Sequence, residues 1–153
     1  MSGRRIAACL LIVTIAIAVT ACSDDTAAYE HPAAVAVAGV LELRSAGNTD
    51  TVAYEPFFSD PALAAQLAGN TSPGTSAVPD WQEPYVSRLA DESADVVVRW
   101  DDAAGAFPDW PKVTVFSLSL LDGRWVIVDA TDPPGTTPPP LTDEQLSDKT
   151  VGN

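Results

Sequence analysis

Apolar and polar positions divide the chain into a helical first part and a β-rich second part. After Pro32, residues 33–41 are apolar on nearly every side of a helix, and this pattern predicts a largely buried helix. The helix is expected to run to about Ser45, because Gly47 and Asn48 are typical of a helix end.

Two shorter helical segments are predicted next along the chain. The first lies around residues 49–54. In the second, Asp60 can cap the N-terminus, Pro61 suits the first turn, and Gly69 terminates the apolar run between them. A loop rich in Thr, Ser, Gly and Pro follows, and we interpret Trp81 within it as a plug over the core.

The pattern then changes to that of β-strands. Residues 85–89 and 95–101 are rich in Val and aromatic residues, and they predict an antiparallel pair. Residues 113–121 and 124–129 predict a hairpin, because the Asp-Gly pair at 122–123 is the preferred two-residue turn.

The Asp-Gly turn also sets a register for this hairpin. It places Leu118 opposite Ile127 and Phe116 opposite Asp129. One face of the hairpin is then expected to form a buried apolar wall. Its members are Phe116, Leu118, Leu120, Trp125 and Ile127.

The first 21 residues have the features of an export signal. Arg4 and Arg5 precede an apolar run, residues 6–19, which is shorter than the roughly 20 residues that a membrane span needs. Residues 19–22, Val-Thr-Ala-Cys, resemble the lipobox of bacterial lipoproteins. The resemblance implies that Cys22 carries a diacylglycerol group, becomes the new N-terminus and anchors the chain to a membrane. The alternatives are an uncleaved anchor and a plain signal peptide.

Processing at this site would leave the mature protein without cysteine chemistry. Cys9 would be lost with the leader, and Cys22 would be consumed by the lipid. A cysteine nucleophile, a thiolate zinc site and a disulfide scaffold are then excluded. The expected organisation is a signal peptide at 1–21, an acylated Cys and tether at 22–32, an α+β domain at 33–131 and a Pro/Thr-rich disordered tail at 132–153.

Composition and charge narrow the range of partners. Hydrophobic residues make up 46% of the chain and charged residues 19%, which is ordinary globular usage. The formal net charge is −13, and loss of Arg4 and Arg5 would make the mature protein more acidic still. Because the remaining cations are scattered singly, we expect no nucleic-acid partner. The excess of acidic residues is interpreted as a source of solubility. Calcium binding is the alternative, but residues 101–105 lack the ligand spacing of a calcium loop, and no metal or cofactor is predicted.

The order of the predicted elements resembles that of a known superfamily. A buried helix, two shorter helices and four strands ending in Gly-Arg-Trp-Val-Ile-Val-Asp, residues 123–129, resemble the nuclear transport factor 2-like proteins. This cystatin-like group includes ketosteroid isomerases and SnoaL-type polyketide cyclases. The resemblance covers roughly residues 33–131. It implies an α+β fold in which N-terminal helices pack on a curved antiparallel sheet of about four strands to form a cone.

A cone of this kind would enclose a cavity. The Asp129 carboxyl is predicted to share a face with Phe116 in apolar surroundings, a setting that can serve acid–base chemistry, and it is the single catalytic candidate. The alternative is that Asp129 lies near solvent or pairs with Arg99. His31 is the one histidine of the chain, and we interpret it as an exposed residue rather than a general base. The side chains expected to line the cavity are Tyr54, Tyr85, Trp100, Phe116 and Asp129.

These features predict a lipid-anchored protein at the outer face of the cytoplasmic membrane or in the cell envelope. Its expected role is that of a non-enzymatic module that binds a small apolar ligand or a protein partner, because the sequence has no G-x-S-x-G or phosphate-loop motif. One alternative is an isomerase or cyclase that uses Asp129 with Tyr54 or Tyr85. Another is a structural protein of the envelope.

Cys22→Ser is expected to release the protein from membranes in soluble, folded form. The acyl chains supply the anchor, and an anionic lipid surface repels the acidic domain. The measurement is cell fractionation with detection of the protein in the soluble and membrane fractions. A Cys22→Ser protein that stays in the membrane fraction would contradict lipid attachment at this residue.

Overall fold

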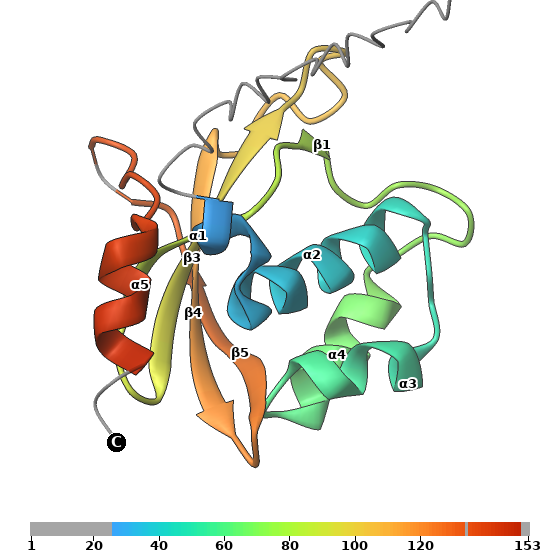
Figure 1. Ribbon diagram of the computed structural model, residues 1–153. Coiled ribbons are helices and arrows are strands. Elements are labelled where there is room, and N and C mark those ends of the chain that lie inside the picture. The colour runs from blue at the N-terminus through green and yellow to red at the C-terminus, as the bar shows by residue number, and fades with distance from the viewer. Residues whose placement is uncertain (1–25, 134, 151–153) are drawn as a thin grey trace, which may run out of the picture.

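Helices cover one side of an antiparallel sheet in the computed structural model, which confirms the predicted α+β class (Figure 1). The structure describes residues 26–133 and 135–150, so the predicted signal peptide and lipobox lie outside it. The elements that come first are helices α1 (Thr26–Glu30), α2 (Pro32–Ser45), α3 (Thr51–Tyr54), the 3-10 helix η1 (Glu55–Phe57) and α4 (Pro61–Gly69). The strands β1 (Asp80–Trp81), β2 (Tyr85–Leu89), β3 (Ser93–Asp101), β4 (Val113–Leu121) and β5 (Arg124–Thr131) follow, and helix α5 (Asp143–Thr150) comes last.

Helix α2 forms over the residues that the sequence predicts and is the main helix of the fold. Pro32 occupies its first turn, and the His31 Nδ1 atom accepts a hydrogen bond from the Ala33 N–H at 3.2 Å. One face of small and branched apolar residues is buried against the sheet. The buried residues are Ala33, Ala34, Val37, Val40 and Leu41.

The two shorter helices begin at capping aspartates. The Asp50 carboxylate accepts a hydrogen bond from the Val52 N–H at 3.0 Å, so α3 starts two residues later than the predicted stretch. The Asp60 carboxylate accepts from the Ala62 N–H at 2.8 Å, which confirms the predicted start of α4. None of the helices within residues 26–133 and 135–150 has the length and hydrophobicity that a membrane span requires.

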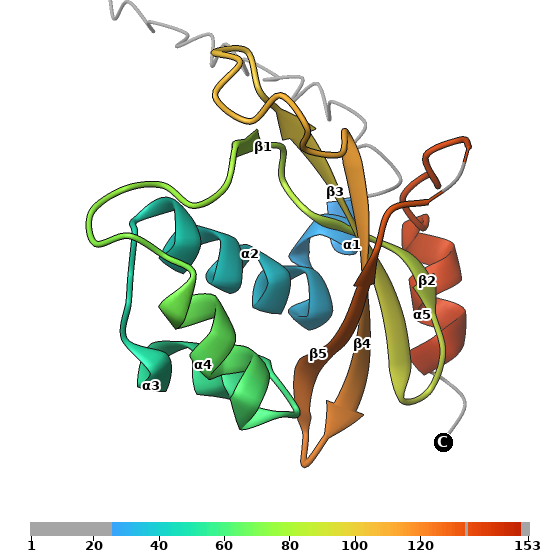
Figure 2. The ribbon, with the colours of Figure 1, turned by 180° about the vertical axis from the view of Figure 1, so that it is seen from behind.

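Strand β3 is the centre of the sheet. The first half of β3 pairs with β2, where Tyr85 lies opposite Val97, and its last residues pair with β1, where Trp81 lies opposite Trp100. Strand β4 pairs along the other edge of β3, and β5 pairs with β4. All of these pairings are antiparallel, as predicted. The sheet curls around α2, which gives the half-barrel shape seen from behind in Figure 2.

The β4–β5 hairpin has the predicted turn but only part of the predicted register. Asp122 and Gly123 both adopt positive φ, at 50° and 75°, and Leu118 lies opposite Ile127. The pairing of Phe116 with Asp129 is wrong, because the register shifts by one residue between Ser117 and Leu118. Asp129 lies opposite Ser117 instead. One extra, unpaired residue in β5 shifts the partner of every residue that follows it in the strand by one position.

Both ends of the described chain join the domain, in contrast to the predicted tether and disordered tail. Ala28 in α1 is completely buried, so the fold begins before residue 33. After β5, the Leu141 N–H donates to the Val86 carbonyl at 2.9 Å, and Leu146 in α5 is buried. Helix α5 lies beside β2 and contacts α1 (Figure 2). The domain therefore extends beyond residue 131 as well.

The end of α2 is joined to the loop before β1 through Gly47. This residue has φ +63°, and the Gly74 N–H donates to its carbonyl oxygen at 3.2 Å. A Cβ at position 47 would lie 2.6 Å from the Gly74 nitrogen and 2.7 Å from the Ser72 carbonyl oxygen. Only glycine therefore fits between the helix end and this loop.

Gly47→Ala is expected to lower the free energy of unfolding by at least about 2 kcal/mol, from the left-handed backbone and the close contacts together. Gly69→Ala is the matched control. A Cβ at Gly69 meets no atom within 4 Å, and alanine in α4 is expected to leave stability unchanged or raise it by up to about 1 kcal/mol. Urea unfolding of both variants measures the difference. Equal stabilities would contradict the tight packing at Gly47.

Candidate functional site

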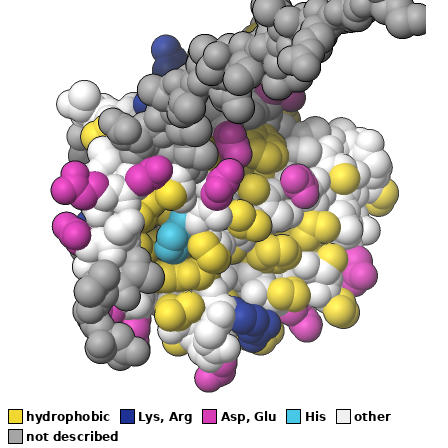
Figure 3. Space-filling model, in the orientation of Figure 1, with side chains coloured by type: hydrophobic (Ala, Val, Ile, Leu, Met, Phe, Trp, Pro, Cys, Tyr) yellow, Lys and Arg dark blue, Asp and Glu magenta, His cyan; other side chains and the backbone are white. Residues whose placement is uncertain are grey.

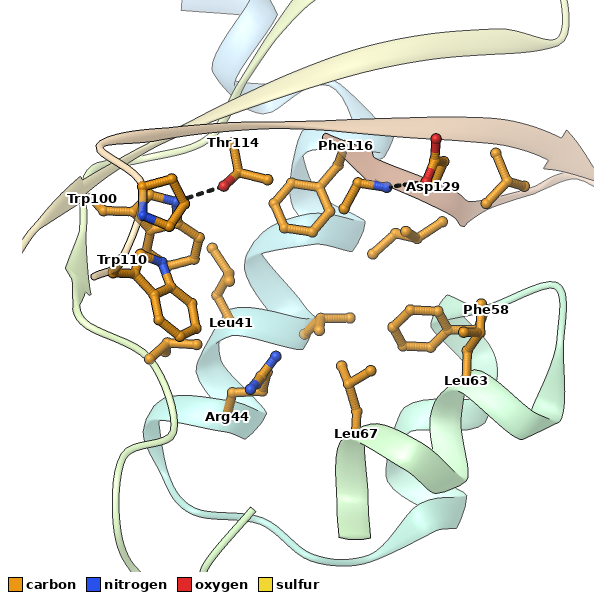
Figure 4. A pocket seen from close by; sticks show the side chains of 16 residues that line it. Leu41, Arg44, Phe58, Leu63, Leu67, Trp100, Trp110, Thr114, Phe116 and Asp129 are labelled. Carbon is orange, nitrogen blue, oxygen red and sulfur yellow. Dashed lines mark hydrogen bonds between the residues drawn. The ribbon is translucent and has the colours of Figure 1, made fainter. Parts of the chain in front are cut away.

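A pocket of about 370 Å³ lies between the helices and the sheet. One wall comes from the C-terminal part of α2 and from α4, and the other comes from β4 and β5 (Figure 4). Most of the lining is aliphatic or aromatic, and the residues with charged or hydroxyl side chains are Arg44, Thr114 and Asp129. Small-molecule sites are concave and mostly apolar, with a few polar groups that fix orientation. The pocket has these properties.

The helical wall follows from the spacing of residues along α2. Val40, Leu41 and Arg44 lie on one face of the helix, as residues one turn apart do, and all three line the pocket. Val37, one turn earlier, is completely buried and is not part of the lining. The helix is therefore packed closely at its N-terminal end and borders open space at its C-terminal end.

Phe58 joins the helical wall to the sheet. Its backbone forms an isolated parallel bridge with Ile127 in β5, and both residues line the pocket. Leu63 in α4 lies beside Phe58 at the same end of the pocket (Figure 4). Two large apolar side chains therefore border this end of the pocket, where Asp129 also lies (Figure 4).

A cluster of aromatic side chains forms the other end. The rings of Trp100 and Trp110 meet edge to face with centroids 5.5 Å apart, and Phe107 makes the same kind of contact with Trp110. The Trp100 indole N–H donates to the Thr114 hydroxyl oxygen at 2.9 Å. That hydroxyl donates in turn to the Asp132 carboxylate at 3.3 Å. These contacts hold Trp100 in place as a wall of the pocket.

Arg44 extends from α2 toward the interior of the pocket (Figure 4). One guanidinium nitrogen, Nη2, donates a long hydrogen bond of 3.4 Å to the Ala77 carbonyl, whereas Nε is buried without a hydrogen-bond partner. Burial lowers the pKa of the Arg44 guanidinium, and the nearby Tyr54 acts in the opposite direction. A guanidinium remains protonated at neutral pH, so the pocket contains one half-buried positive charge.

Asp129 lines the pocket from β5 but is not surrounded by apolar groups. Its side chain is exposed, and its carboxylate accepts a hydrogen bond from the N–H of the next residue, Ala130, at 2.9 Å. The alternative position near solvent is therefore the one that the structure has. Arg99, the other partner considered for Asp129, donates to the Tyr85 hydroxyl at 3.3 Å.

The two tyrosines predicted for the cavity do not line this pocket. The Tyr54 hydroxyl donates to the Asn48 carbonyl at 2.9 Å, and the Tyr85 hydroxyl donates to the Pro138 carbonyl at 2.6 Å. Burial raises the pKa of Tyr85, and its neighbour Arg99 partly offsets this. Of the predicted lining residues, the pocket brings together Trp100, Phe116 and Asp129. The set of Asp129 with a tyrosine that an isomerase mechanism requires is not assembled.

Arg44 and Trp110 are the two pocket residues with unpartnered buried nitrogens, and sequence reasoning named neither of them as lining. Arg44 carries a usable signal, because it follows Val37 and Val40 at helical spacing and so falls on the buried face of α2. Trp110 lies in the loop between β3 and β4, and no periodicity places a loop residue.

His31 is half-buried, in contrast to the exposed position that the sequence suggested. Its ring contacts Trp125 edge to face, with centroids 5.5 Å apart, and Figure 3 shows it among hydrophobic side chains. Trp81 is half-buried and donates to the Ser45 hydroxyl at 3.2 Å, in keeping with its interpretation as a plug. Within the described residues, no cluster of His, Cys, Asp and Glu side chains could hold a metal ion.

Comparison of the chain with protein-family models, with curated proteins and with solved structures gives no significant match.

Acidification is expected to destabilise the protein through His31. Only the neutral imidazole can accept the Ala33 N–H, and burial lowers the pKa of His31 below its ordinary value of about 6.5. The contribution of this side chain is therefore complete above about pH 6.5 and is lost as the pH falls from there toward the folded-state pKa. Urea midpoints at pH 7.5 and pH 5.5 measure the loss.

His31→Asn is the control for this experiment, because asparagine caps helices well and does not titrate. The drop in midpoint between the two pH values is expected to be smaller in this variant than in the original protein. The same drop in both proteins would show that other groups cause it.

Proposed function

We propose that the protein is a lipid-anchored, non-enzymatic module that binds a small apolar ligand in the pocket between α2, α4 and the sheet. The observation that carries the proposal is a mostly apolar pocket of about 370 Å³ between α2, α4 and the sheet. Small-molecule sites are typically concave, mostly apolar and fitted with a few polar groups, as this pocket is. An open pocket supports the small-ligand version of the binding hypothesis over the protein-partner version.

The size and lining of the pocket limit the ligand. At the roughly 30 Å³ that one water occupies in the liquid, the space corresponds to on the order of a dozen non-hydrogen atoms. A ligand of this size that gains about 0.3 kcal/mol per atom binds with about 4 kcal/mol, a dissociation constant near 1 mM, and better complementarity makes it tighter. Aromatic walls from Trp100, Trp110 and Phe116 favour apolar bodies.

The arrangement of the elements supports a cone of the nuclear transport factor 2-like kind as part of this proposal. Helices α2, α3 and α4 precede the strands, the sheet curls around α2, and the pocket lies between α2 and the last hairpin. The fold forms the pocket, and the side chains that line it determine which ligand binds.

Lipid attachment at Cys22 is the second part of the proposed function. Residues 19–22 support acylation at Cys22, and residues 23–25 alone separate that cysteine from helix α1. A domain so joined would remain close to the outer face of the cytoplasmic membrane or to another envelope membrane. Cys9→Ser, which alters the other cysteine of the chain, is the matched control for the Cys22→Ser fractionation and should stay with the membranes.

Decanamide, a neutral amphiphile with 12 non-hydrogen atoms, is expected to bind the delipidated protein with a dissociation constant near or below about 1 mM. Because Trp100 and Trp110 line the pocket, tryptophan emission should change as the pocket fills. Native mass spectrometry gives the stoichiometry, which should be one molecule per chain. It also detects any species that is retained from the cell.

Leu67→Trp should weaken this binding at least about tenfold, because the larger side chain fills the space between α4 and the sheet. Ala65→Trp places the same side chain on an exposed position of the same helix and should leave the affinity unchanged. Circular dichroism verifies that both variants fold. Absence of binding by the original protein, or equal binding by all three, would refute the proposed function.

A further inference from the structure

We infer that the ligand is an amphipathic organic monoanion whose acidic head group is bound by Arg44 and Trp110 and whose apolar tail occupies the rest of the pocket. The inference rests on the proposed function and specifies the chemical class of ligand for the same pocket. It is carried by unpartnered donors, by one unpaired charge and by the distribution of side chains along the pocket.

Two N–H groups in the pocket wall have no hydrogen-bond partner. Among the described residues, the buried side-chain nitrogens without a partner are Arg44 Nε and Trp110 Nε1, and both residues line this pocket. Buried polar groups are nearly always paired in folded proteins, and the exceptions require an explanation. An acidic head group supplies acceptor oxygens of the kind that these two donors lack.

The positive charge of Arg44 also lacks a counterion. Within the described part of the chain, the one ion pair joins Arg88 Nε and Asp95 Oδ2 at 2.6 Å. No carboxylate in that part of the chain pairs with Arg44. This is unexpected in a chain with 21 acidic residues. Partial burial of a charge is unfavourable unless the charge is paired, and a carboxylate matches the planar fork of a guanidinium with two parallel hydrogen bonds. The one carboxylate that lines the pocket, Asp129, is exposed and bonds to a backbone N–H.

The one cation of the pocket lies away from its one carboxylate. Arg44 and Trp110 lie toward one end in Figure 4, and Phe58, Leu63 and the exposed Asp129 lie toward the other. One cation with one indole N–H matches a head group of a single negative charge, and the aliphatic and aromatic remainder matches a tail. A doubly charged head group would leave one charge buried without a partner.

The test compares decanoate with decanamide, which have the same chain length and the same carbonyl but differ in charge. We expect the original protein to bind decanoate at least about tenfold more tightly than decanamide at pH 8, because a charge-assisted hydrogen bond is about twice as strong as a neutral one. Tryptophan fluorescence and isothermal titration calorimetry measure both affinities.

Arg44→Met should abolish this preference, with the two affinities within about threefold of each other, because the charge that distinguishes the two ligands is lost. Arg124→Met removes the same charge from the exposed hairpin turn and should retain the full preference. Circular dichroism and thermal melting establish that each variant is folded. If Arg44→Met does not fold, the comparison of the two ligands on the original protein still decides the inference.

The possible outcomes separate this inference from the proposed function. Equal binding of decanoate and decanamide by the original protein, or a preference that survives Arg44→Met, overturns the anionic head group and leaves a neutral apolar ligand. Arg44 would then have a structural role, joining α2 to the loop at Ala77. Failure of both compounds to bind overturns the proposed function itself.

Discussion

The packing of α2 against the curled sheet is the contact on which the rest of the structure depends. Ala33, Ala34 and Val37 are short enough for the N-terminal half of the helix to lie close to the strands, and all three are buried. Farther along, Val40, Leu41 and Arg44 face the pocket. One helix thus closes the core at one end and leaves it open at the other. The pocket is a consequence of where along α2 the close packing stops.

Arg44 gives this open end a polarity that the rest of the lining lacks. The guanidinium lies at the end of a helix, where exposed carbonyl groups favour a positive charge, and it contacts the loop at Ala77. These contacts explain how the cation is tolerated in a mostly apolar pocket. They leave its Nε and the Trp110 indole nitrogen without partners. The same two groups therefore limit both the stability of the empty site and the chemistry of a ligand that enters it.

Local signals allowed much of the fold to be predicted, and contacts between distant segments account for what was missed. Pro32 and Asp60 act on the first turn of their own helices, and the Asp-Gly pair forms a turn by itself. Each signal is local, so these elements were predicted correctly. The docking of the chain ends depends on β2, which no pattern near residues 26 or 141 indicates. The extra residue in β5 changed the environment of Asp129, and a loop brings Trp110 to the pocket. The site was therefore predicted less completely than the sheet that supports it.

The hydrogen bond from the Ala27 N–H to the Asp143 carboxylate joins the two ends of the described chain across 116 residues. Closing a loop of this length opposes folding by about 4 kcal/mol of chain entropy, which the burial of Ala28 and Leu146 must offset. Contacts of such high sequence separation form late in folding. Helix α1 emerges before the other described elements during synthesis, yet its final packing has to wait for α5. A chain truncated before α5 would expose to solvent the part of α1 that α5 covers.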